Sequence, residues 1–228
     1  MAVISWRYSY LFIQAPNTAC TATAAALMAD CDGEKCPPRS ILNPDGSVGV
    51  REKHCTISDL TGHDVLSQAQ LADLFKFTTV RNPFDILVSR WNRAGAVLQE
   101  AERNREHWLH RKPGAIEGRR KMASQSFPDW VVKTYGKSRR GLWRARRTDH
   151  DMNGRFIAGT DAIMRFENLE ADFKDVLKNL GVQTDVNLPK LNVDQTRRRD
   201  YRTYYTAEAR KVVETAFRDE LKTLGYEF

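Results

Sequence analysis

The sequence predicts an α/β protein in which a mainly parallel sheet is flanked by helices. Short apolar segments rich in aromatic and β-branched residues alternate along the chain with longer segments of helical periodicity. Strands that alternate with helices form parallel sheets that are covered on both faces. A length of 228 residues suits one substantial domain, so we expect residues 1–228 to form a single domain.

The first predicted strand covers residues 8–13, and an Ala-rich helix is predicted at about 21–29. The residues 14–22 that connect them read Q-A-P-N-T-A-C-T-A. Such a strand–loop–helix can bind an anion, because the first turn of a helix leaves N–H groups unpaired and carries a partial positive charge. The loop lacks the glycines and the Lys-Ser/Thr ending of a Walker A loop. Taken alone, it is more often an ordinary turn.

A second pair of elements is predicted after an irregular loop at 30–49 and a helix at 56–74. Residues 75–80 (F-K-F-T-T-V) predict a buried strand that stops at Arg81. A helix is expected from Pro83 onward, because proline suits the first turn of a helix. An arginine at a strand end, with the Ser89 hydroxyl two turns further on, suits a terminal phosphate. A surface arginine and a solvated serine are the commoner alternative.

The last predicted elements are a strand at 162–166, a helix at 167–180 and a helix at about 206–223. Because ligands bind at the carboxyl ends of parallel strands, the 14–22 loop and Arg81 are expected to converge on one site.

A basic segment at about 94–150 separates the two halves of this pattern. Residues 101–150 contain fourteen Lys/Arg against five Asp/Glu, and the whole chain has a net charge of +7. This charge favours an anionic partner, and for an enzyme it suggests an acidic or already sulfated saccharide as the acceptor. A solvated helical face is the commoner alternative. A nucleic-acid partner is not expected, because the basic residues lack interleaved aromatic residues and known binding motifs.

Several stretches resemble, in order, the PAPS-dependent sulfotransferase family (PAPS is 3′-phosphoadenosine 5′-phosphosulfate), notably its carbohydrate sulfotransferases and their soluble bacterial relatives. The pattern R-N-P-x-x-x-x-V-S is complete as RNPFDILVS, and A-P-N-T-A-C-T-A is a degraded form of I-P-K-T-A-G-T-S. Further matches are K-H-C-T at 53–56, R-F-E-N-L at 165–169, Y-R-T-Y-Y at 201–205 and G-Y-E-F at 225–228. The resemblance implies a P-loop-NTPase-like sulfotransferase fold.

The resemblance also implies the reaction and its residues. A sulfuryl group would move from PAPS to an acceptor hydroxyl of a saccharide or other small alcohol, with adenosine 3′,5′-bisphosphate as the product. His54 is the expected general base, with a histidine packed at a helix start as the alternative. Glu167 fits better as a structural carboxylate at a helix start. The expected contacts to PAPS are Pro16, Asn17, Thr18, Ala19, Cys20, Thr21, Ala22, Arg81, Ser89, Arg198 and Tyr201.

Asn17 stands where the family pattern has a lysine, and it can donate a hydrogen bond but cannot supply charge. Losing such a contact can cost on the order of 10²–10³ in rate. Lys53 or a residue of the 94–150 segment would have to compensate. The alternative is a PAPS-binding relative with weakened catalysis that acts as a binding module, supported by Asn17, Cys20 and Ala22.

The remaining expectations rest on missing signals. No apolar run is long enough to cross a bilayer, so no membrane span is expected and a cytoplasmic location is the default. Cys31 and Cys36 match no zinc pattern, so no metal is expected and the cysteines are interpreted as thiols. The sequence predicts no oligomeric state.

Overall fold

The computed structural model describes residues 2–136, 151–183, 186–189, 191 and 200–228. Its packing divides the chain into two compact units, each made of two chain segments. The first unit comprises Met1–Arg81 and Met152–Val193, and the second comprises Asn82–Asp151 and Asp194–Phe228. The expectation of a single domain stays a prediction.

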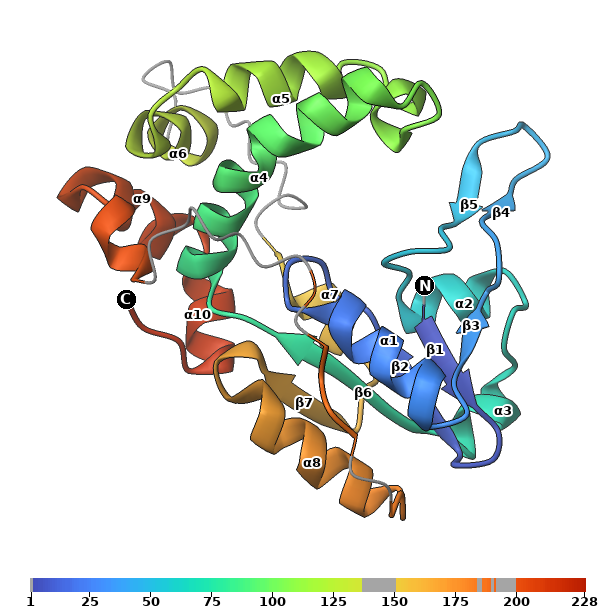
Figure 1. Ribbon diagram of the computed structural model, residues 1–228. Helices are drawn as coiled ribbons and strands as arrows, with labels where there is room; N and C mark the ends of the chain where they lie inside the picture. Colours follow the sequence, from blue (N-terminus) through green and yellow to red (C-terminus); the bar gives the residue numbers. More distant parts are fainter. Residues whose placement is uncertain (1, 137–150, 184–185, 190, 192–199) are drawn as a thin grey trace. The chain divides into compact units, whose positions relative to one another are not determined.

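A five-stranded sheet forms the centre of the first unit (Figure 1). Its strands follow the order β3 (Glu34–Cys36), β1 (Ala2–Ser5), β2 (Tyr10–Ile13), β6 (Phe75–Val80), β7 (Ala162–Arg165). β2, β6 and β7 are parallel neighbours, whereas β1 is antiparallel to both β2 and β3. Four of these five strands therefore point the same way. The predicted fold class, a mainly parallel sheet flanked by helices, is confirmed.

The two faces of this sheet are covered by different helices, as the alternation of buried side chains along each strand requires. Tyr10 and Phe12 of β2 face α1 (Cys20–Asp30) and α8 (Leu169–Asn179). Leu11 and Ile13 face α2 (Ile57–Gly62), α3 (Gln68–Ala72) and α7 (Gly154–Ile157). All four cysteines are buried thiols within these two apolar clusters.

The carboxyl ends of the three parallel strands meet at one edge of the sheet. Ile13 pairs with Thr78 of β6, and Val80 pairs with Arg165 of β7. The residues that follow these strands, Gln14, Arg81 and Phe166, therefore leave the sheet at the same edge. The architecture thus places the 14–22 loop beside the Arg81 turn.

Several sequence-based boundaries were wrong. The predicted strand at 8–13 is not the first, because β1 precedes it. The predicted loop at 30–49 contains β3 and a small antiparallel hairpin of β4 (Ile41–Leu42) and β5 (Val48–Val50). The predicted helix at 56–74 is two short helices, because Ser67 begins a new helix with a capping box to Gln70. Likewise, the final predicted helix is divided at Phe217 into α9 (Ala207–Ala216) and α10 (Arg218–Leu224).

The second unit is helical. Its longest element is α4 (Pro83–Arg103), which begins with Pro83 in its first turn and is capped by the Asn82 side chain. Helix α5 (Ala115–Ala123) lies along α4, and α6 (Phe127–Tyr135) packs against α9 (Figure 1). A 3-10 turn, η1 (Trp108–Arg111), lies between α4 and α5.

Aromatic side chains from the C-terminal segment pack on the start of α4. The Phe84 ring lies 5.0 Å from the Phe228 ring and 5.4 Å from the Tyr205 ring, measured between centroids. The Tyr205 hydroxyl also donates to the main-chain oxygen of Phe84 at 2.9 Å. The C-terminal motifs at 201–205 and 225–228 thus contribute to the core of the second unit. No helix in the described part of the chain is long and apolar enough to span a membrane.

Candidate functional site

The loop between β2 and α1 has an unusual backbone. Asn17 and Ala19 both have left-handed conformations, with φ of 67° and 60°. Asparagine tolerates this conformation, whereas in alanine it costs about 1–2 kcal/mol. The Thr18 hydroxyl donates to the main-chain oxygen of Ala15 at 2.8 Å and is buried, so it holds the loop closed. Backbone strain of this kind is concentrated at functional sites.

This loop presents unused donors at the start of α1. The helix has no side-chain cap, and the N–H groups of Thr18, Ala19 and Cys20 donate to no acceptor among the described residues. The N-terminus of a helix with open N–H groups is suited to an anion. Cys20 and Ala22 are only 4% and 6% exposed, and the Ala22 N–H already donates to the main-chain oxygen of Ala19, so of these two residues only Cys20 has an unused N–H.

Arg81 joins three parts of this edge of the sheet. Its Nη1 donates to the main-chain oxygen of Asn17 at 2.9 Å, and its guanidinium lies 3.8 Å from the centroid of the Phe166 ring. Its backbone N–H and C=O pair with the side-chain amide of Asn153 at 3.2 and 3.1 Å. Arg81 is only 4% exposed. The loop and the Arg81 turn converge as predicted, and Arg81 holds the loop directly.

His54 lies beside the same loop. Its Nδ1 is 3.0 Å from the main-chain oxygen of Gln14. Because a carbonyl oxygen can only accept, Nδ1 must carry the proton, and Nε2 of the neutral ring is left as an acceptor. Burial lowers the pKa of His54 to about 4, and the positive charges of Lys53 and Arg155 act in the same direction. The imidazole is therefore neutral at pH 7.

Two exposed cations flank this histidine. Lys53 precedes it in the chain and also lies near the start of α1, where it opposes the rise that burial causes in the pKa of the Cys20 thiol. Arg155 belongs to α7. The sequence predicted Lys53 but not Arg155 or Asn153, because no motif or local pattern marks either residue. The loop, Lys53, His54, Arg81 and Arg155 form a positively charged site in the first unit.

Two other predicted contacts belong to the second unit. Ser89 is partly exposed on α4. Tyr201 lies in the 3-10 turn η3 (Tyr201–Tyr204), where its hydroxyl accepts from Asn82 Nδ2 at 3.2 Å. Asn82 Nδ2 also lies 2.8 Å from the main-chain oxygen of Glu227, so this residue ties the C-terminal segment to α4, a role that sequence reasoning missed. Arg198 lies outside the described residues.

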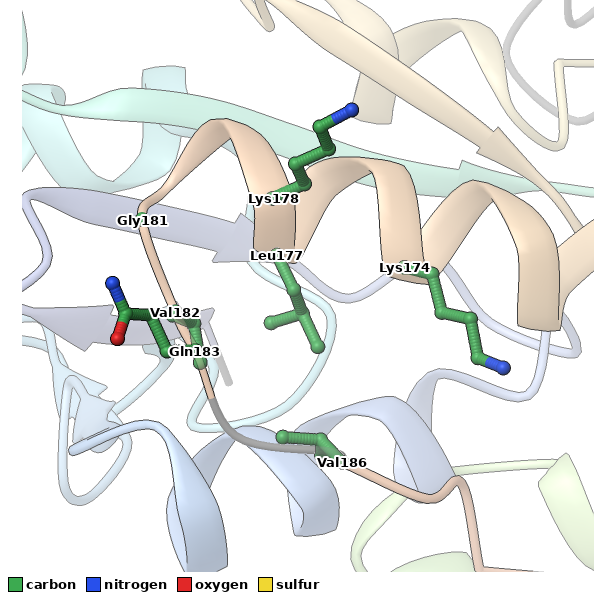
Figure 2. A pocket seen from close by; sticks show the side chains of 7 residues that line it. All are labelled: Lys174, Leu177, Lys178, Gly181, Val182, Gln183 and Val186. Atoms are coloured by element: carbon green, nitrogen blue, oxygen red, sulfur yellow. The ribbon is translucent and has the colours of Figure 1, made fainter.

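A separate cavity of about 300 Å³ lies at the C-terminal end of α8. Figure 2 shows its lining, in which the ammonium groups of Lys174 and Lys178 point in different directions. Phe166, which contacts Arg81, precedes the opposite end of α8. The cavity contains none of the predicted site residues, and its lysines do not converge on a common point.

The first unit is thus an α/β fold with a strand–loop–helix at the carboxyl edge of its parallel strands and with the cations Lys53, Arg81 and Arg155 beside it, a class of site that suits an anion. The model of the sulfotransferase family matches residues 1–227, and the chain belongs to that family. Neither the curated proteins nor the solved structures contain a significant match to the chain.

Proposed function

We propose that this chain is a PAPS-dependent sulfotransferase that transfers a sulfuryl group to the hydroxyl of a saccharide or other small alcohol. Family membership supports sulfuryl transfer. The observation that carries the choice of donor is the hydrogen bond from Arg81 Nη1 to the Asn17 oxygen, which joins the two motifs that resemble PAPS-binding segments. The N–H groups of Thr18, Ala19 and Cys20 fit the oxygens of a phosphosulfate.

The site residues of the first unit then have distinct roles. When bound, PAPS supplies an activated sulfuryl group with adenosine 3′,5′-bisphosphate as its leaving group. The N–H groups at the start of α1 hold anionic oxygens, and the Lys53 ammonium supplies the charge that Asn17 cannot. His54 accepts the acceptor's proton at Nε2 while its Nδ1–H stays on the Gln14 oxygen.

A pKa of about 4 makes His54 a weak base when no ligand is bound. An anion at the neighbouring loop stabilises the imidazolium and raises this pKa toward neutrality. Binding of PAPS would therefore make His54 a stronger base for the proton of the acceptor hydroxyl.

The test is thermal unfolding with adenosine 3′,5′-bisphosphate, with ADP and AMP as controls. At a hundred times its Kd a ligand adds about 2.7 kcal/mol. That increment raises Tm by about 5–10 °C for a chain of this size. A rise confined to the 3′,5′-bisphosphate supports the proposal, and transfer from PAPS to a panel of alcohols then measures turnover. Equal or absent shifts with all three nucleotides contradict it.

A further inference from the structure

Three arginines of the second unit lie on α4 and α5, which pack together, and the charges of the two on α4 act on the one on α5. Arg90 and Arg93 are one turn apart on α4, so they are neighbours on its surface. Arg119 lies on α5, which runs alongside α4 (Figure 1). Trp91 fixes this contact, because its Nε1 donates to the main-chain oxygen of Gln125 just beyond α5, at 3.1 Å. We call these three residues the arginine cluster.

The charge of the arginine cluster is not balanced by the described part of the protein. None of its members forms an ion pair with a described residue. Arg119 is half-buried, and its Nη1 contacts the Met122 sulfur at 4.0 Å. Burial lowers the pKa of Arg119, and the charges of Arg90 and Arg93 lower it further. Withdrawing a cation from water toward two others is costly unless an anion offsets the cost.

Guanidinium groups are suited to one chemical class of partner. Their planar forks bind the paired oxygens of carboxylates, sulfates and phosphates, and several forks can share one such group. Arg119 lies in the basic segment at 94–150, which contains none of the family motifs found in the sequence, and Arg90 and Arg93 follow the end of the RNPFDILVS motif. Acceptors differ between sulfotransferases, whereas the donor is shared. Residues outside the donor-binding motifs are therefore suited to contact the acceptor.

We propose that Arg90, Arg93 and Arg119 form an oxyanion site for a sulfate or carboxylate group of the acceptor. The inference rests on the proposed function for its choice of the acceptor. The site makes the enzyme select an acidic saccharide over a neutral one, because a neutral acceptor leaves the clustered cations without an anion.

The experiment is calorimetric titration with a heparin-derived hexasaccharide, and with maltohexaose as a neutral probe of equal length. Arg119→Met is expected to weaken hexasaccharide binding about tenfold or more, as expected for lost hydrogen bonds to a charged group. The double variant Arg90→Met/Arg93→Met is expected to weaken it further. Arg120→Met is the matched control, since Arg120 is the exposed neighbour on α5 and its loss changes the net charge equally.

The outcomes separate this inference from the proposed function. Equal losses in Arg119→Met and Arg120→Met, or no hexasaccharide binding by the wild type, overturn the site. Adenosine 3′,5′-bisphosphate is titrated into the same variants and is expected to bind unchanged. If Arg119→Met weakens only the nucleotide, the cluster binds the donor and the acceptor assignment is wrong. If the wild type binds hexasaccharide through the cluster but no nucleotide, the oxyanion site stands and the proposed donor fails.

Tm without ligand shows whether a weakened variant is still folded. Arg119→Met is expected to raise Tm, because it removes a charge that the described residues do not balance. A folded variant with a higher Tm and weaker hexasaccharide binding supports the site. A large fall in Tm contradicts it, because Arg119 would then be structural.

Discussion

Arg81 and Arg119 are both withdrawn from water, but their surroundings differ. Arg81 is bounded by protein groups that complement it, since a carbonyl oxygen accepts from it and an aromatic ring lies against its guanidinium. The charges of two further arginines act on Arg119, and no acidic side chain among the described residues pairs with it. One arginine organises a loop within the fold, whereas the charge of the other is left for a partner that the fold does not supply.

The comparison shows that the effect of burying a charged side chain depends on the groups around it. Where the protein supplies the complement, as for Arg81, the arginine stabilises the folded state and shapes the site. Where neighbours carry the same charge, as for Arg119, the arginine destabilises the free protein and indicates a ligand.

The largest expected effect is a difference in sign between two matched variants. Arg81→Met is expected to lower the free energy of unfolding by about 3 kcal/mol, because it removes a charged hydrogen bond and a cation–π contact. It is also expected to lower sulfuryl transfer by about 10²–10³, because the loop loses its support. Urea unfolding at pH 7 measures the first effect, with exposed Arg39→Met as a control. If Arg81→Met and Arg119→Met change stability in the same direction, the comparison is wrong.

A smaller effect concerns His54, which burial and neighbouring cations keep neutral. Its pKa is about 4 when folded and 6.5 in the reference state, so the unfolded chain binds the extra proton between these values. The free energy of unfolding is therefore unaffected by this group above pH 6.5, and it decreases as the pH falls from 6.5 toward 4. Between pH 7 and pH 5 the loss is about 2 kcal/mol.

His54→Asn is expected to flatten this pH dependence, since asparagine tolerates the φ of 62° at this position. Urea unfolding at several pH values measures the slope, and His63→Asn, at an exposed histidine, is expected to retain it because His54 remains. An unchanged slope in His54→Asn would show that another group causes the acid sensitivity.

The smallest expected effect is a gain in stability within the loop. Ala19→Gly is expected to raise the free energy of unfolding by about 1 kcal/mol, because glycine adopts a φ of 60° without a clash. Ala25→Gly, in the middle of α1, is the matched control and is expected to lower it by about the same amount. Loss of stability in Ala19→Gly would mean that the left-handed conformation carries no strain.

Features encoded by neighbouring residues were predictable from the sequence. The strand Phe75–Val80 was predicted with its observed bounds, and the start of α4 at Pro83 was also predicted. Both depend on local signals, namely a run of aromatic and β-branched residues and a proline in a first helical turn. The division of residues 56–74 into two helices was also encoded locally, by the capping box at Ser67, but it was overlooked.

The candidate site was predictable only where a motif carried it. Asn17, His54 and Arg81 were chosen because they matched family patterns, and the structure gathers them at one edge of the sheet. Asn153 and Arg155 carry no such pattern, and their positions depend on the packing of a distant helix, α7, near the end of β6. Short β1 was missed because three apolar residues followed by a serine do not distinguish a strand from a turn.

The sequence by itself determined the fold class, the family and the residue types available for binding anions, because these follow from periodicity and from motifs of contiguous residues. Tertiary structure alone decided that Arg81 holds the Asn17 carbonyl, that Gln14 sets the tautomer of His54, and that the charges of Arg90 and Arg93 act on Arg119. Each of these interactions joins residues far apart in the chain. Long-range partners are selected by the packing of whole elements, which no local pattern encodes.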